Sequence, residues 1–102
     1  MARIIDKASW HIDNGMPKEQ VVTHFKFIFE WLRKNKLLSE DGKEILDIGI
    51  DSSISLNEKM LQKEAFNFLE KYYDEYIKSV QYGIKEDEKL LDKYYTEFLD
   101  KN

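Results

Sequence analysis

The segment PKEQVVTHFKFIFEWLRK, residues 17–34, decides the fold. Its apolar residues recur at intervals of three and four, which predicts a helix that begins at Pro17, where a missing N–H costs nothing. On a helical wheel His24, Phe27 and Trp31 widen the apolar arc to well over half of the circumference. Such a helix must be covered from two sides, so we expect the rest of the chain to pack around it.

A second, shorter helix is predicted after this one. Ser39 is a typical N-cap, and Glu40 and Asp41 place negative charge at the positive end of the helix dipole. Gly49 is expected to end this helix. Because residues 44–51 also alternate in part between apolar and polar, the sequence leaves open whether they form helix or a buried strand.

Two long amphipathic helices are predicted in the second half, from about residue 57 or 62 to a stop near Gly83, and over about 85–99. Residues 68–78 and 90–100 are identical at five of eleven positions, which favours an antiparallel helix hairpin, since two copies are too few for a solenoid.

The expected fold is therefore all-α, a single helical domain over residues 1–102. It is a bundle of three long helices and one short helix, with a short extended N-terminal segment. With 42% hydrophobic and 35% charged residues, the composition is that of a globular protein. The absence of cysteine excludes disulfides, thiolate nucleophiles and cysteine-ligated zinc. No apolar run approaches the roughly 20 residues that span a bilayer, so we expect a cytoplasmic protein outside the membrane.

The net charge of −4 is unevenly distributed. Residues 1–50 carry eight acidic and eight basic side chains, whereas residues 51–102 carry twelve acidic and eight basic ones. An acidic surface repels phosphate backbones and attracts basic proteins. We therefore expect a protein partner rather than a nucleic acid.

The stretch ASWHIDNGMP, residues 8–17, would place Ser9, His11 and Asp13 on one side of an extended chain. Nucleophilic catalysis also needs an aimed hydroxyl, an oriented imidazole and an oxyanion site, which sequence adjacency does not supply. The favoured interpretation is a hinge, in which Asp13 or Asn14 caps either the helix that begins at Pro17 or the turn before it. Gly15 then adopts a backbone conformation closed to other residues, and Trp10 anchors the chain against the core. No catalytic residue is assigned.

Metal binding is the second interpretation of this region, because His11 and His24 with Asp6 or Asp13 would supply nitrogen and oxygen ligands. Their spacing matches no metal motif, so no metal or cofactor is expected. Whether the two histidines share a site is left open by the sequence. The alternative site for a small enzyme or ligand-binding domain comprises Trp10, His11, Asp13 and His24.

Tyrosines recur at helical spacing in the second half, as Tyr72-Tyr73 and Tyr94-Tyr95. A stacking platform for bases or sugars is one interpretation. Rings at the edge of the core, with hydroxyls reaching water or a partner, are more typical of this spacing. The charged run KEDEK, residues 85–89, is interpreted as the solvated first turn of the last helix.

In several motifs the chain resembles a family of small uncharacterised bacterial proteins, and some members of that family look like immunity proteins of polymorphic toxin systems. The motifs are DKASWH at residues 6–11, the Thr23-His24 pair, and LLSE at residues 37–40. A looser echo lies in FLEKYYDEY, residues 68–76. The resemblance implies a non-enzymatic antitoxin that masks a toxin domain, and it carries over no catalytic residue.

Charge, size and resemblance together predict a non-enzymatic protein-binding module whose acidic C-terminal hairpin meets a basic toxin domain. The expected contact residues are Tyr73, Asp74, Glu75 and Tyr76. A homodimeric helical scaffold is a third hypothesis, which predicts an exposed apolar stripe.

Overall fold

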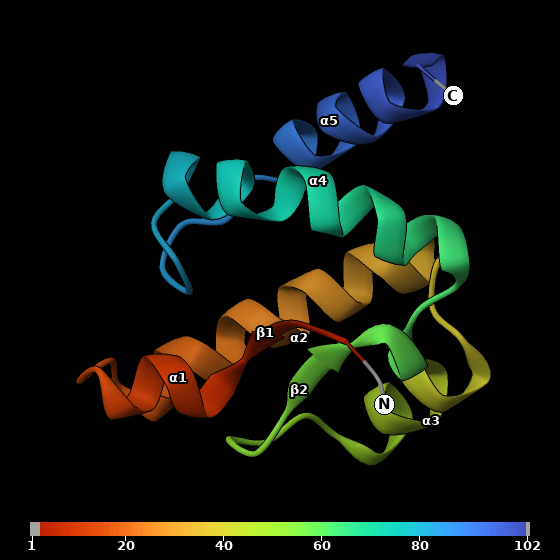
Figure 1. The fold of residues 1–102 in the computed structure, drawn as a ribbon. Coiled ribbons are helices and arrows are strands. Elements are labelled where there is room, and N and C mark those ends of the chain that lie inside the picture. The colour runs from red at the N-terminus through yellow and green to blue at the C-terminus, as the bar shows by residue number, and fades with distance from the viewer. Residues whose placement is uncertain (1–2, 102) are drawn as a thin grey trace.

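The computed structural model describes residues 3–101. Its elements, in chain order, are β1 (Ile4–Lys7), α1 (Ala8–Asp13), α2 (Lys18–Lys34), α3 (Glu40–Ile48), β2 (Ser55–Asn57), the 3₁₀ helix η1 (Glu58–Met60), α4 (Lys63–Ser79) and α5 (Glu88–Lys101). The chain is mostly helical, as expected, but β1 and β2 also form a small antiparallel sheet (Figure 1). Among the described residues, no helix has both the length and the apolar character needed to cross a bilayer.

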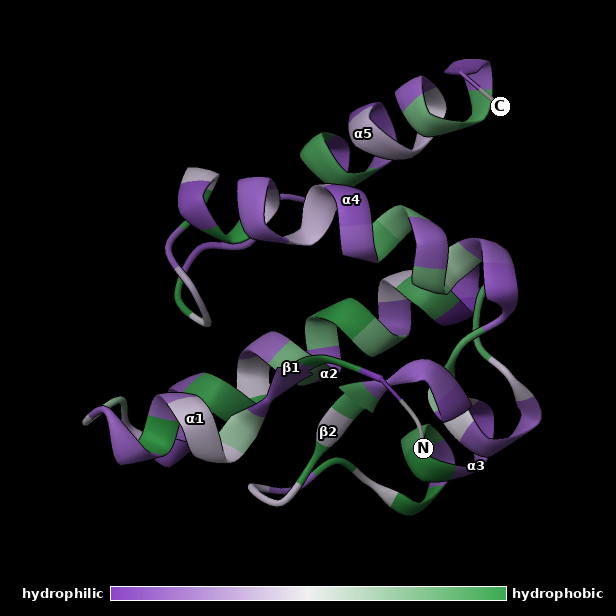
Figure 2. Cartoon of the chain, in the orientation of Figure 1, coloured by the Kyte–Doolittle hydropathy of each residue, from purple (hydrophilic) through white to green (hydrophobic). Residues whose placement is uncertain are grey.

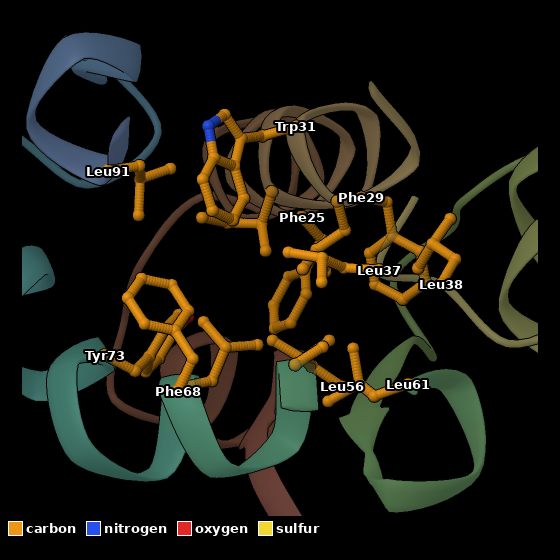
Figure 3. Packing of buried hydrophobic residues seen from close by; sticks show 14 of the residues in the cluster. Phe25, Phe29, Trp31, Leu37, Leu38, Leu56, Leu61, Phe68, Tyr73 and Leu91 are labelled. Carbon is orange, nitrogen blue, oxygen red and sulfur yellow. The ribbon is translucent and has the colours of Figure 1, made fainter. Parts of the chain in front are cut away.

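Helices α2 and α4 contribute the largest shares of the core, with seven buried residues each. α1 packs near the start of α2 and α3 near its end, while α4 crosses above α2 in Figure 1. Figure 3 shows Phe25 of α2 among side chains from several other elements, including Phe68 of α4 and Leu56 of β2. Hydrophobic and hydrophilic residues alternate along both α2 and α4 (Figure 2), and the buried residues of the two helices belong to one hydrophobic cluster.

Helix α3 resolves the ambiguity at residues 44–51 in favour of helix as far as Ile48. Its N-cap is Ser39, as predicted, and the Ser39 side chain accepts a hydrogen bond from the Gly42 N–H. Gly49 ends the helix at a φ of 122°. The helix lies against α2 and η1, with Gly42 buried and Ile45 and Leu46 partly buried.

The N-terminal segment is extended over β1, where it pairs with β2 in the register Asp6↔Leu56. An irregularity between Ile4 and Asp6 interrupts the pairing, as a β-bulge does. In a regular strand these two side chains would share one face. With the bulge, Ile4 is 43% exposed while Asp6 is only 4% exposed. The bulge thus directs a carboxylate into the interior.

The predicted hinge at residues 8–17 is wrong in part. Residues 8–13 form helix α1, and Trp10 is 48% exposed rather than anchored in the core. The N-cap position of α2 is Pro17, without a side-chain cap, so neither Asp13 nor Asn14 serves that helix. The Asn14 amide instead donates to the Trp10 carbonyl, 2.7 Å away, and closes the end of α1.

The C-terminal helices form the expected hairpin with shifted ends. α4 ends at Ser79, before Gly83, and α5 begins at Glu88, after a loop of residues 80–87 (Figure 1). α5 buries Leu91 and Phe98.

Candidate functional site

Two polar side chains lie in the otherwise apolar interior of the described residues. Asp6 is 4% exposed and His24 is fully buried. Burying a charge is costly unless it is paired and hydrogen-bonded, so their surroundings require a complete account of donors and acceptors. Hydrogen bonds and ring contacts join them to five other side chains, and we call the whole set the buried polar network: Asp6, His11, His24, Tyr73, Tyr76, Tyr82 and Glu86.

The Asp6 carboxylate occupies one end of this network. Its Oδ2 accepts hydrogen bonds from the Tyr73 hydroxyl at 2.5 Å and the Tyr82 hydroxyl at 3.0 Å. Its Oδ1 accepts the Lys7 backbone N–H at 2.8 Å and lies 2.7 Å from His11 Nε2. Donors therefore face both oxygens, which offsets the cost of burying this side chain.

The His24 imidazole connects the two carboxylates. Its Nε2 lies 2.7 Å from the Tyr73 hydroxyl oxygen, and its Nδ1 lies 2.7 Å from Glu86 Oε2. Glu86 also accepts the Gly83 N–H at 2.6 Å and the Tyr76 hydroxyl at 2.7 Å. The network therefore links β1, α2, α4 and the loop of residues 80–87.

The Tyr82 ring fills the space between the two histidines. Its centroid lies 3.7 Å from that of His24, with the rings stacked, and 4.4 Å from that of His11. The Gln20 amide donates to the Tyr82 carbonyl at 2.7 Å and holds the ring in place. His11 and His24 therefore belong to one network, but the Tyr82 ring lies between their imidazoles.

Burial and neighbouring charge set the protonation of the phenols and of Glu86. Burial, and then the negative charge of Asp6, hold the pKa of Tyr73 well above its usual range, and burial also raises the pKa of Tyr76 and of Tyr82. Burial alone would raise the pKa of Glu86. The hydrogen bond and charge of His24, with the Gly83 N–H and the Tyr76 hydroxyl, outweigh burial and lower it. The phenols thus keep their protons and Glu86 is ionised.

Only part of the alternative site predicted from the sequence is brought together. His11 and His24 both belong to the network, with the His11 side chain 23% exposed. Trp10 and Asp13 are exposed on α1 and are not members of it. Within residues 3–101, no group of three or more histidine and acidic side chains is arranged to hold a metal ion.

The predicted contact residues on α4 divide into two pairs. Asp74 and Glu75 are exposed, but Tyr73 is 3% exposed and Tyr76 is fully buried. A partner at the surface of this structure would not reach either ring, because both hydroxyls bind buried carboxylates. The expectation that the Tyr73 and Tyr76 rings contact a partner is therefore wrong for this structure, because both rings are packed in the core.

Sequence reasoning missed Tyr82 and the role of Glu86, which it placed in a solvated turn. It named Asp6 only as a candidate metal ligand. His24 meets Glu86 across 62 residues, and Tyr82 meets Asp6 across 76. No local periodicity signals contacts at such separations, so these residues had no detectable signature.

The comparisons with protein families, with curated proteins and with solved structures find no match for this chain. The chemistry of the network must therefore be argued from its geometry. Its members are paired with one another, and its chain of short hydrogen bonds suits it to hold a proton. His11, partly exposed, connects Asp6 to the surface.

Removing the Tyr73 hydroxyl should lower the free energy of unfolding by about 2–3 kcal/mol, because Tyr73→Phe removes one buried hydrogen-bond partner from Asp6 and one from His24. The neighbouring Tyr72 provides a matched control. Its hydroxyl is buried and has no hydrogen-bond partner among the described residues, so Tyr72→Phe should be neutral or slightly stabilising. Urea unfolding of both variants measures the difference, and equal effects would contradict the assigned network.

Proposed function

We propose that this chain is a non-enzymatic protein-binding module that acts in the manner of an immunity protein, covering a basic domain of its partner. The support is a surface on and after α3, which we call the α3 patch. It consists of an exposed isoleucine surrounded in sequence by exposed acidic residues: Glu40, Asp41, Glu44, Asp47, Ile48 and Asp51.

The α3 patch concentrates the negative charge of the protein. Residues 40–51 carry five acidic side chains and one basic side chain, a net charge of −4, which equals that of the whole chain. Helices α4 and α5 each carry four acidic and three basic side chains and are nearly balanced. Negative charge is therefore denser along residues 40–51 than along either C-terminal helix, which supports the α3 patch as the contact surface in place of the hairpin that we expected.

Ile48 is the single observation that carries the proposal. Its side chain is 77% exposed beside a shallow hollow of about 290 Å³, whose lining includes Ile45, Ile54 and Met60. An apolar anchor point ringed by charged groups is typical of an interface hot spot. The matching occupant is a partner protein that inserts an apolar side chain into the hollow and presents lysine or arginine around it.

One observation favours the second candidate, a small enzyme or ligand-binding domain. His11 is partly exposed and its Nε2 contacts the buried Asp6 carboxylate. Such a pair would let the imidazole accept a proton from a ligand at the surface. The remaining members of the network are already paired with one another, so we rank this candidate second.

The test begins with capture of a basic protein from lysate of the source organism and continues with that protein purified. Wild type should form a stoichiometric complex that weakens with added salt. Ile48→Ala should weaken the complex about 30-fold by removing a hot-spot contact worth about 2 kcal/mol. Isothermal titration calorimetry on the purified pair gives the affinity.

Two control variants separate the candidates. Ile84 is 70% exposed in the loop of residues 80–87, away from α3 in Figure 1, so Ile84→Ala should leave the affinity unchanged. His11→Gln should also leave it unchanged on the leading proposal. Equal affinities for wild type and Ile48→Ala, or a loss confined to His11→Gln, would refute the α3 patch as the binding surface.

A further inference from the structure

The number of protons in the network follows from the hydrogen bonds that His24 and its neighbours make. Asp6, Tyr73, His24 and Glu86 follow one another through three contacts, of 2.5, 2.7 and 2.7 Å. Each contact needs one proton between its two heavy atoms, because two lone pairs at such distances repel.

The Tyr73 hydroxyl has a single proton to donate. The contact with Asp6 takes that proton, because the Tyr73 hydroxyl donates to Asp6 Oδ2. The contact between Tyr73 and His24 must then be donated by Nε2. Tyr73 is thus an acceptor toward His24 and a donor toward Asp6.

The other nitrogen of His24 must donate as well. Glu86 already receives the Gly83 N–H and the Tyr76 hydroxyl, and the Tyr76 oxygen itself accepts the Asp87 N–H at 3.0 Å. Glu86 is an ionised acceptor on every side, so the contact at Nδ1 is donated by His24. Both ring nitrogens donate, which is the pattern of an imidazolium.

We propose that the buried polar network is a proton-binding site, in which folding places one proton on His24 and this proton fastens the loop of residues 80–87 to α2. The inference is independent of the proposed function. Titratable groups surround His24 from each element packed on it: Asp6 of β1, His11 of α1, Tyr73 and Tyr76 of α4, and Tyr82, Glu86 and Asp87 of the loop.

The proton stabilises the contact between the loop of residues 80–87 and α2, because Glu86 and Tyr82 of the loop both contact His24. Without it, one nitrogen lone pair would face an oxygen lone pair, either toward Glu86 or toward Tyr73. Either arrangement weakens the connection between α2 and the residues that lead into α5. The site thus couples the pH of the surroundings to the attachment of the C-terminal hairpin.

The direction of the pH effect follows from proton counting. In an unfolded chain a histidine loses its proton near pH 6.5, whereas the native network retains it. The native state then binds one proton more, so stability is full below about pH 6.5 and the unfolding constant rises about tenfold per pH unit above it. Glu86 acts in the opposite direction, because its lowered pKa removes stability as pH falls below the unfolded value of 4.5.

Urea unfolding between pH 5 and pH 9 tests the proposal. Wild type and Asp13→Asn, a change at an exposed position outside the network, should show the tenfold rise per pH unit above about pH 6.5. His24→Gln should lose this rise, since a neutral amide takes up no proton. A flat wild-type profile, or the same slope in His24→Gln, would overturn the proposal.

Nitrogen-15 NMR of the wild-type imidazoles decides the matter if His24→Gln does not fold. At pH 8 the His24 ring should show two protonated nitrogens, with both N–H protons protected from exchange. A ring with one protonated and one bare nitrogen at that pH would refute the assignment.

Discussion

Replacing Asp6 by asparagine is expected to lower the free energy of unfolding by about 3–5 kcal/mol, the usual cost of removing one partner from a buried charged group. The carboxylate accepts hydrogen bonds from Tyr73, Tyr82 and the Lys7 backbone and contacts His11. In asparagine an NH2 group would replace one of the two carboxylate oxygens. Its protons would face the groups that donate to that oxygen, so those hydrogen bonds would be lost. Urea unfolding at pH 7, followed by fluorescence of the buried Trp31, measures the loss.

The matched control is Asp13→Asn, the same chemical change at an exposed position on the neighbouring helix α1. Surface substitutions of this kind usually change stability by less than about 0.5 kcal/mol. Similar losses for both variants would mean that Asp6 has no special role. A large loss for Asp6→Asn alone would support the buried network.

Gly83→Ala is expected to lower the free energy of unfolding by about 2–5 kcal/mol, by two additive costs. Gly83 has a φ of 70°, a left-handed conformation that costs other residues about 1–2 kcal/mol. An added Cβ would also lie 2.0 Å from the Gln20 carbonyl oxygen, a backbone atom that cannot rotate away. The loop must shift, and the Gly83 N–H then leaves Glu86.

Gly15→Ala separates the two costs. Gly15 has a φ of 98°, but an added Cβ there meets no atom within 4 Å. Only the conformational cost of about 1–2 kcal/mol should appear. Thermal and urea unfolding of both variants should therefore rank Gly83→Ala as the more damaging, and the reverse order would show that the loop does not pack against α2 as described.

The proposed binding surface and the proton site lie in different parts of the molecule. Ile48 is largely exposed on α3, whereas His24 is fully buried in α2. Ile48→Ala should change affinity without changing the pH dependence of unfolding, and His24→Gln should do the opposite. The two proposals can therefore fail separately.

The sequence by itself determined what local periodicity and capping govern. The spacing of apolar residues was sufficient to locate the central helix α2, and Ser39 was sufficient to mark the start of α3, because both signals lie within a few residues of the structure they produce. The helical spacing of the α4 tyrosines was sufficient to place their rings on the apolar face of the helix. It did not show that the Tyr73 and Tyr76 hydroxyls bind buried carboxylates rather than a partner.

Only the tertiary structure decided the interior polar site. β2 is three residues long, too short to show an alternating pattern, and the bulge that turns Asp6 inward depends on pairing with it. Glu86 belongs to a charged run that locally resembles a solvated turn, and only its distant partner His24 makes burial favourable. Residues so far apart in the sequence can form hydrogen bonds only after the chain has folded. Their contribution to stability therefore exists only in the folded state and leaves no local pattern in the sequence.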